Sequence, residues 1–173
     1  MGTVNSGMFT SETNEWPTPG ELFAALDAEF GFDLDPCATA ENAKCARFYT
    51  EADDGLTQPW DGTVFMNPPY GRQIGDWMRK AADEAERGAT VVCLIPSRTD
   101  TAYWHETAMR ASELRFIRGR LHFANARHAD RVADGRATAH NAPFPSVIVV
   151  FRPGHLGAPQ VSAIDRQGRE VQS

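Results

Sequence analysis

Apolar side chains recur every three or four residues between positions 20 and 30, a spacing that predicts an amphipathic helix. The apolar face of this helix comprises Leu22, Phe23, Leu26 and Phe30. Thr18 is expected to cap its first turn, with Pro19 at the first helical position and Glu21 completing a capping box. Gly31 is expected to end the helix.

Three apolar segments have the pattern of strands. Residues 32–35 alternate between apolar and acidic side chains as far as Pro36. Residues 63–66 have the pattern of a short buried strand, and residues 90–95 form a longer apolar run, as in a strand covered on both faces. A helix is predicted between the last two strands, and another over about residues 101–112. The apolar face of the first of these helices comprises Ile74, Trp77, Met78, Ala81, Ala82 and Ala85. This alternation predicts an α/β domain with a mostly parallel sheet and helices on both faces.

The pattern changes after residue 120. Residues 121–123 and 146–151 are expected as two late strands, joined by a long polar excursion. Loops longer than about 15 residues in compact domains are usually functional or disordered. The expected organisation is a flexible N-terminus (1–13), one domain (14–152) containing the excursion (120–145), and a polar tail (153–173) with no predicted element.

Length and composition bound the class of protein. With 173 residues and 42% hydrophobic content, the chain can bury one core but not two ordinary domains. Because no apolar run reaches the length of a membrane span and no leader is visible, a soluble intracellular protein is expected. Three cysteines in unrelated contexts favour reduced thiols, and no metal site is expected because ligand pairs are absent.

Charge is unevenly distributed along the chain. The net charge of −6 argues against a polyanionic partner, but residues 1–60 hold eleven acids against Lys44 and Arg47. Residues 110–136 hold seven arginines against three acids. Most such asymmetries are solvated faces that bind nothing, and charge alone favours that interpretation over a nucleic-acid partner for the basic segment.

The motif Asn67-Pro68-Pro69-Tyr70, directly after a predicted strand, carries the most specific chemistry. The Asn67 side chain and the Pro68 carbonyl can accept hydrogen bonds from a weakly nucleophilic amine, such as the exocyclic nitrogen of adenine, and stabilise the charge that develops during methyl transfer. The prolines hold both carbonyls rigidly. Tyr70 offers a flat face for a flipped base.

Acidic side chains follow the first predicted strand. Asp35, which Pro36 and Cys37 follow, can bind the cationic end of a cofactor. Parallel topology is expected to bring it to the same sheet edge as Asn67 and Arg98. One member of a later acidic group is expected to accept from the hydroxyls of a ribose. That group is Glu51, Asp53 and Asp54, and the choice among them stays open.

These motifs together resemble the small phage-type, Dam-like DNA N6-adenine methyltransferases. The resemblance extends over about residues 14–152 and includes the segments Trp16-Pro17-Thr18-Pro19, Phe30-Gly31-Phe32-Asp33-Leu34-Asp35, Asn67-Pro68-Pro69-Tyr70-Gly71, Pro96-Ser97-Arg98-Thr99-Asp100, Gly119-Arg120-Leu121-His122-Phe123 and Ala142-Pro143-Phe144-Pro145-Ser146. Unlike larger relatives, the chain lacks a glycine-rich cofactor loop and a separate target-recognition domain, which leaves the recognised DNA sequence open.

The resemblance implies a Rossmann-like methyltransferase fold, S-adenosylmethionine as the donor, double-stranded DNA as the partner, and a bacterial or phage-infected cytoplasm. The catalytic residues it implies are Asn67, Pro68, Pro69 and Tyr70. The candidate cofactor-binding residues are Trp16, Thr18, Pro19, Asp35, Pro36, Cys37 and Asp54. The candidate DNA-binding residues are Arg98, Arg118, Arg120, Arg127, Arg131 and Arg136.

Two other functions fit parts of the pattern. The motif at Asn67 also suits methylation of a protein glutamine, although the arginine-rich segment favours nucleic acid. A non-catalytic DNA-binding protein that retains the fold is the second alternative, but its catalytic motif would be expected to decay, and Asn67 and Tyr70 are both present.

Overall fold

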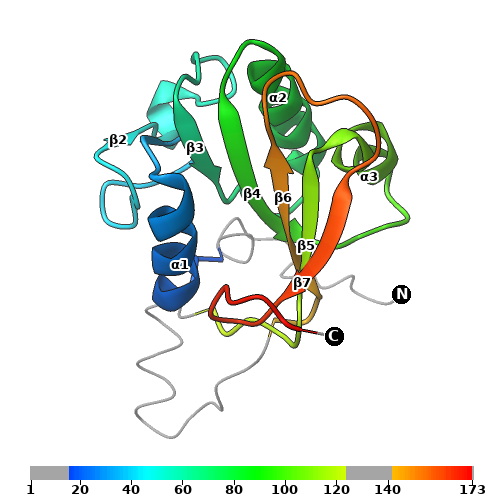
Figure 1. The fold of residues 1–173 in the computed structure, drawn as a ribbon. Coiled ribbons are helices and arrows are strands. Elements are labelled where there is room, and N and C mark those ends of the chain that lie inside the picture. Colours follow the sequence, from blue (N-terminus) through cyan, green and yellow to red (C-terminus); the bar gives the residue numbers. More distant parts are fainter. Residues whose placement is uncertain (1–15, 124–141, 173) are drawn as a thin grey trace, which may run out of the picture.

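The computed structural model of the chain describes residues 16–123 and 142–172 (Figure 1). They form one seven-stranded sheet with the strand order β2-β1-β3-β4-β6-β5-β7. The strands are β1 (Leu34–Asp35), β2 (Arg47–Phe48), β3 (Thr63–Met66), β4 (Thr90–Pro96), β5 (Glu113–Ile117), β6 (Ser146–Phe151) and β7 (Gln160–Ile164). No helix within the described ranges is both long and apolar enough to cross a bilayer.

Strand direction places the carboxyl ends of six strands at one edge of the sheet. β1, β2, β3 and β4 pair in parallel, and β5 pairs in parallel with β7. β6 lies antiparallel between β4 and β5, so β5 runs in the same direction as β4. The prediction of a mostly parallel sheet is therefore confirmed, and polar residues that follow β1, β3, β4, β5 and β7 share one edge.

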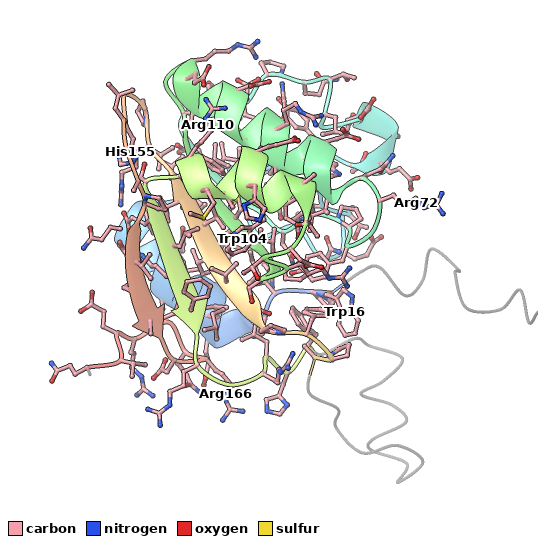
Figure 2. The ribbon with its side chains drawn as sticks, turned by 90° about the vertical axis from the view of Figure 1, so that its right-hand side faces the viewer. Trp16, Arg72, Trp104, Arg110, His155 and Arg166 are labelled. Carbon is pink, nitrogen blue, oxygen red and sulfur yellow. The ribbon has the colours of Figure 1, made fainter. Side chains whose placement is uncertain are left out.

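Helices cover both faces of this sheet. α1 (Gly20–Phe30) lies on one face, and α2 (Ile74–Glu86) and α3 (Ala102–Glu106) lie on the other (Figures 1 and 2). All six apolar residues predicted for the α2 face are buried. Gly31 ends α1 in the left-handed conformation with φ 64°, which glycine adopts without steric cost. These predictions are confirmed.

The helix predicted over residues 101–112 is shorter than expected. α3 ends at Glu106, and a 3-10 turn, η4 (Ala108–Arg110), follows it. Thr107 between them has φ −124° and ψ −60°, outside the helical region. A second 3-10 turn, η3 (Glu51–Asp53), lies in the acidic loop after β2.

The C-terminal part of the chain differs most from the predictions. The first late strand is β5, whereas residues 121–123 form no strand. In this segment Leu121 and Phe123 are buried, and His122 contacts Arg166. The tail of residues 153–173 adds β7 to the sheet, so the domain extends beyond residue 152. Most of the predicted excursion, residues 124–141, lies outside the described residues, as does the N-terminus before Trp16.

Candidate active site

The ends of β1 and β3 open on a cavity of about 660 Å³. Among the predicted site residues, its walls contain Trp16, Thr18, Asp35, Pro36, Cys37, Asn67, Pro68 and Pro69. Pro19, Asp54, Tyr70 and Arg98 do not line it. Parallel topology thus brings the cofactor candidates and the catalytic motif together, as the sequence predicts.

The side-chain amide of Asn67 is held by the segment that precedes α1. Its Nδ2 donates to the main-chain oxygen of Trp16 at 2.6 Å and to Oγ1 of Thr18 at 2.9 Å. The predicted cap is therefore wrong: Pro19 occupies the N-cap position of α1, no side chain caps the helix, and the Thr18 hydroxyl contacts Asn67 instead.

The other end of this amide has no partner. Oδ1 of Asn67 is buried, and no described residue donates a hydrogen bond to it. An unsatisfied buried acceptor costs about 1–3 kcal/mol, so its presence in a native fold needs an explanation. An amine that enters the site would supply the missing donor.

The backbone of Asn67 is tied to the end of β1 as well. The Cys37 thiol donates to the main-chain oxygen of Asn67 at 3.2 Å. Burial raises the pKa of Cys37 well above its ordinary value, and the nearby Asp35 carboxylate raises it further, so this thiol stays protonated and keeps its hydrogen to donate. The contact joins the end of β1 to the segment that follows β3.

Tyr70 lies beneath an aromatic cluster instead of presenting an open face. Its hydroxyl donates to the main-chain oxygen of Leu94 at 3.2 Å, and its side chain is 5% exposed. Phe144 contacts the ring edge-on, with the centroids 5.3 Å apart, and Phe123 does so at 6.5 Å. The expected free stacking face is thus absent from this conformation, and stacking on a base requires these rings to move.

Asp35 stands at the end of β1 with its carboxylate buried. Its two oxygens accept from the amides of Cys37 at 3.4 Å and Lys44 at 3.2 Å. Burial raises the pKa of the Asp35 carboxyl above its ordinary value, and the two amide hydrogen bonds and the Lys44 charge offset this only in part. The exposed Lys44 also lines the cavity, and its Nζ lies 5.9 Å from the centroid of the Phe23 ring.

The three acids of the loop after β2, among which the sequence did not decide the ribose contact, have different positions in the structure. Only Glu51 lines the cavity. Asp53 accepts from the amide and hydroxyl of Thr50 at 2.8 Å each, which closes the capping box of η3. Asp54 is exposed in the left-handed conformation with φ 52° and is not among the residues that line the cavity, so the geometry favours Glu51 over Asp54 as the candidate.

Trp77 of α2 is a cavity residue that sequence reasoning placed only in the core. Its ring stacks on Trp60, with the centroids 6.0 Å apart, and its Nε1 is buried without a partner among the described residues. The loop after β2 packs closely against Pro36 at Gly55. A Cβ at this position would lie 2.0 Å from the main-chain oxygen of Pro36, so only glycine fits. The helical spacing of apolar residues predicts that Trp77 is buried, but it does not tell whether the indole N–H has a hydrogen-bond partner.

Arginines gather at the same edge of the sheet as the cavity. Arg98 follows β4, Arg118 and Arg120 follow β5, and Arg166 follows β7, all beyond carboxyl ends of strands. A shallow depression contains Arg118, Arg120 and Arg166, and Figure 2 shows Arg166 at the opposite end of the molecule from Arg110. The three other DNA-binding candidates lie outside the described residues: Arg127, Arg131 and Arg136.

The charge separation in the sequence is only partly a separation in space. Arg115 of β5 forms two hydrogen bonds of 2.7 Å with Glu29 of α1 and also pairs with Glu113. Arg110 pairs with Glu86. Both of these arginines of the basic segment therefore have acidic partners in the fold, although Arg110 is exposed, as Arg118 and Arg120 are.

Comparisons with known proteins agree with this geometry. A family model described as DNA N-6-adenine-methyltransferase (Dam) matches residues 5–170. The DNA N-6-adenine-methyltransferase of Haemophilus phage HP1 is 30% identical over 147 residues, which cover 83% of this chain and 81% of that protein. The protein of the same description from Escherichia phage T1 is 33% identical over 109 residues, which cover 61% of this chain and 45% of that protein.

The match to the phage T1 protein therefore spans less than half of its length. Among solved structures, a predicted O-methyltransferase from Agrobacterium tumefaciens is similar with a TM-score of 0.43 and 16% sequence identity, over 84% of each chain.

Proposed function

The chain belongs to the DNA N-6-adenine-methyltransferase (Dam) family, an adenine-specific group of DNA methyltransferases, and from this premise we propose how its site works. The cavity binds S-adenosylmethionine, and Asn67 receives the exocyclic amine of an adenine taken out of double-stranded DNA. The observation that carries this proposal is the buried Oδ1 of Asn67, which has no partner among the described residues. Asn67 comes directly after β3.

The reaction needs hydrogen-bond acceptors more than a base. The lone pair of the adenine amine is delocalised into the ring, and the nitrogen becomes positively charged as the methyl group arrives. Oδ1 of Asn67 and the main-chain carbonyl of Pro68 accept from this amine and stabilise the developing charge. Because the prolines restrict the backbone on both sides of the Asn67–Pro68 peptide bond, these acceptors need little reorganisation.

The cavity suits the proposed donor in size and in chemistry. About 660 Å³ lies within the usual range for sites of small molecules and cofactors, roughly 300–1,000 Å³. Asp35 would hold the ammonium group and Lys44 the carboxylate of the methionine part. The orphaned Nε1 of Trp77 offers a donor, and Glu51 an acceptor, to the nucleoside part. When bound, the cofactor supplies an electrophilic methyl group on a sulfonium.

We place the DNA backbone along the arginine edge. Phosphate contacts hold a duplex in position. The exposed Arg98, Arg118 and Arg120 follow β4 and β5, at the same edge of the sheet as the catalytic motif after β3. Arg166 joins them from the C-terminal segment. A duplex bound there would lie along the sheet edge at which Asn67 also lies.

The arginine edge can be tested by the salt dependence of binding. Replacing Arg118, Arg120 and Arg166 together by alanine should weaken DNA binding and lower the slope of log K against log salt by about three, because each phosphate contact contributes about one. Fluorescence anisotropy with a labelled duplex measures both quantities. Arg110→Ala is the matched control, since Arg110 is exposed at the other end of the molecule and paired with Glu86. An unchanged slope in the triple variant would place the phosphate contacts elsewhere.

The role of the Tyr70 ring can be separated from that of its hydroxyl. Tyr70→Phe loses one neutral hydrogen bond to Leu94 and should cost about 1 kcal/mol of stability while keeping most of the methylation rate. Tyr70→Ala should lose productive capture of the base, because no ring remains to stack on it once Phe123 and Phe144 move aside. Thermal unfolding and initial rates distinguish the two effects. A Phe variant as inactive as the Ala variant would contradict a stacking role.

Transfer of tritium from labelled S-adenosylmethionine tests the whole proposal. Label should enter DNA and appear as N6-methyladenine after nucleoside analysis. Label in protein instead would favour the glutamine alternative, and stoichiometric DNA binding without label transfer would favour a non-catalytic binding protein.

A further inference from the structure

The orientation of the Asn67 amide follows from its two hydrogen bonds. A main-chain carbonyl can only accept, so the group that lies 2.6 Å from the oxygen of Trp16 must be the NH₂ of the amide. With the amide turned over, two acceptor oxygens would face each other at that distance. The carbonyl of Trp16 therefore directs Oδ1 away from this segment.

Thr18 uses the remaining proton of the same NH₂ group. Its Oγ1 accepts at 2.9 Å, so both hydrogens of Nδ2 are satisfied. The Thr18 side chain is buried, and it is not used to cap α1. The hydroxyl has no structural partner among the described residues other than this amide.

The segment that presents these two acceptors is stiff. Pro17 and Pro19 flank Thr18 and restrict the backbone on either side of it. The Trp16 ring is held edge-on between Phe123 and Phe144, with centroid distances of 5.2 Å and 5.3 Å. Acceptors on such a segment hold the amide in one orientation without reorganisation.

We propose that the Trp16 carbonyl and the Thr18 hydroxyl form an amide clamp, which positions Asn67 so that Oδ1 faces the target amine. Thr18 is then a positioning residue for methyl transfer and not primarily a cofactor contact. This inference rests on the proposed function of Asn67 as the acceptor for the adenine amine.

Thr18→Val removes the acceptor and keeps the shape of the side chain, so it separates the two roles. We expect kcat for DNA methylation to fall by about 3- to 10-fold, corresponding to the loss of one neutral hydrogen bond, with the Kd for S-adenosylmethionine unchanged within about twofold. Thr18→Ser keeps the bond and should recover most of the rate. In an Asn67→Ala background, Thr18→Val should lower the residual rate no further, because the group it positions is gone.

A second measurement does not depend on activity. The side-chain NH₂ of Asn67, assigned by NMR, should exchange its protons more slowly with solvent in the wild type than in Thr18→Val. A raised Kd with an unchanged kcat in Thr18→Val would make Thr18 a cofactor contact and overturn the clamp. Unchanged values of both kcat and Kd would also overturn the clamp. Absence of N6-methyladenine with the wild-type protein would instead count against the proposed function, while the NMR comparison would still test the clamp.

Discussion

Replacing Asn67 by alanine is expected to slow methyl transfer to DNA by about 10² or more, because the reaction loses a preorganised acceptor aimed at the developing charge. Affinity for S-adenosylmethionine should stay nearly intact, since Asn67 is proposed to contact the target amine and not the methionine part. Single-turnover rates with a saturating duplex measure the first quantity, and isothermal titration calorimetry measures the second. An alanine variant that no longer binds the cofactor would overturn this assignment.

Asn67→Asp is the sharper companion to this experiment. The variant keeps an oxygen in place of Oδ1 but replaces the NH₂ by a second acceptor, which would face the carbonyl of Trp16 at about the present 2.6 Å. Such a contact is repulsive unless the carboxyl is protonated or turns away. We therefore expect Asn67→Asp to be impaired at neutral pH and to recover in part as pH falls. Full activity at neutral pH would show that the amide orientation is not decided by this contact.

Asp35→Asn is expected to weaken cofactor binding by about 10- to 150-fold, which corresponds to about 1.5–3 kcal/mol for a hydrogen bond to a charged group. The asparagine keeps the size of the side chain but only one acceptor oxygen, so one of the two amide hydrogen bonds, from Cys37 or from Lys44, is lost, and thermal unfolding of the variant measures that cost. Calorimetric titration with S-adenosylmethionine measures the change directly. Unchanged affinity would reduce Asp35 to a residue of the turn after β1.

The same carboxyl predicts a pH dependence. Burial raises the pKa of Asp35, so this group takes up its proton at a higher pH than an ordinary aspartate. Because the charged form is the one that attracts the ammonium group, cofactor affinity should fall as the pH is lowered through this raised pKa. Asp35→Asn should flatten that part of the profile, which distinguishes titration of Asp35 from acid unfolding.

The predictable part of the fold is where several local signals agree. In β3 the apolar run of Val64, Phe65 and Met66 leads directly into a proline motif, and the following helix has a clear apolar face, so β3 and α2 were predictable. β2 and β7 were not. β2 has two residues, and β7 is a largely exposed edge strand whose only buried side chain is Ile164, so neither has the alternation that identifies a half-buried strand.

The site divides in the same way. Asp35 and Asn67 could be predicted as neighbours because parallel topology brings strand ends together. That Glu51 and not Asp54 lines the cavity could not be predicted, because it depends on a left-handed turn at Asp54 that no local pattern specifies. Thr18 was misassigned for a related reason: its sequence context satisfies the rule for a helix cap, but a tertiary contact with Asn67, 49 residues away, takes its hydroxyl instead.

The reversed strand β6 has a consequence for how the chain reaches this structure. β4 is complete at Pro96, but its partner on one side is β6, which begins at Ser146. During synthesis, the apolar edge of β4 therefore has no native partner until about fifty further residues have been added. A nascent or truncated chain that ends before β6 would expose a continuous run of Val91 to Ile95 as an unpaired edge, the kind of segment that pairs with other chains.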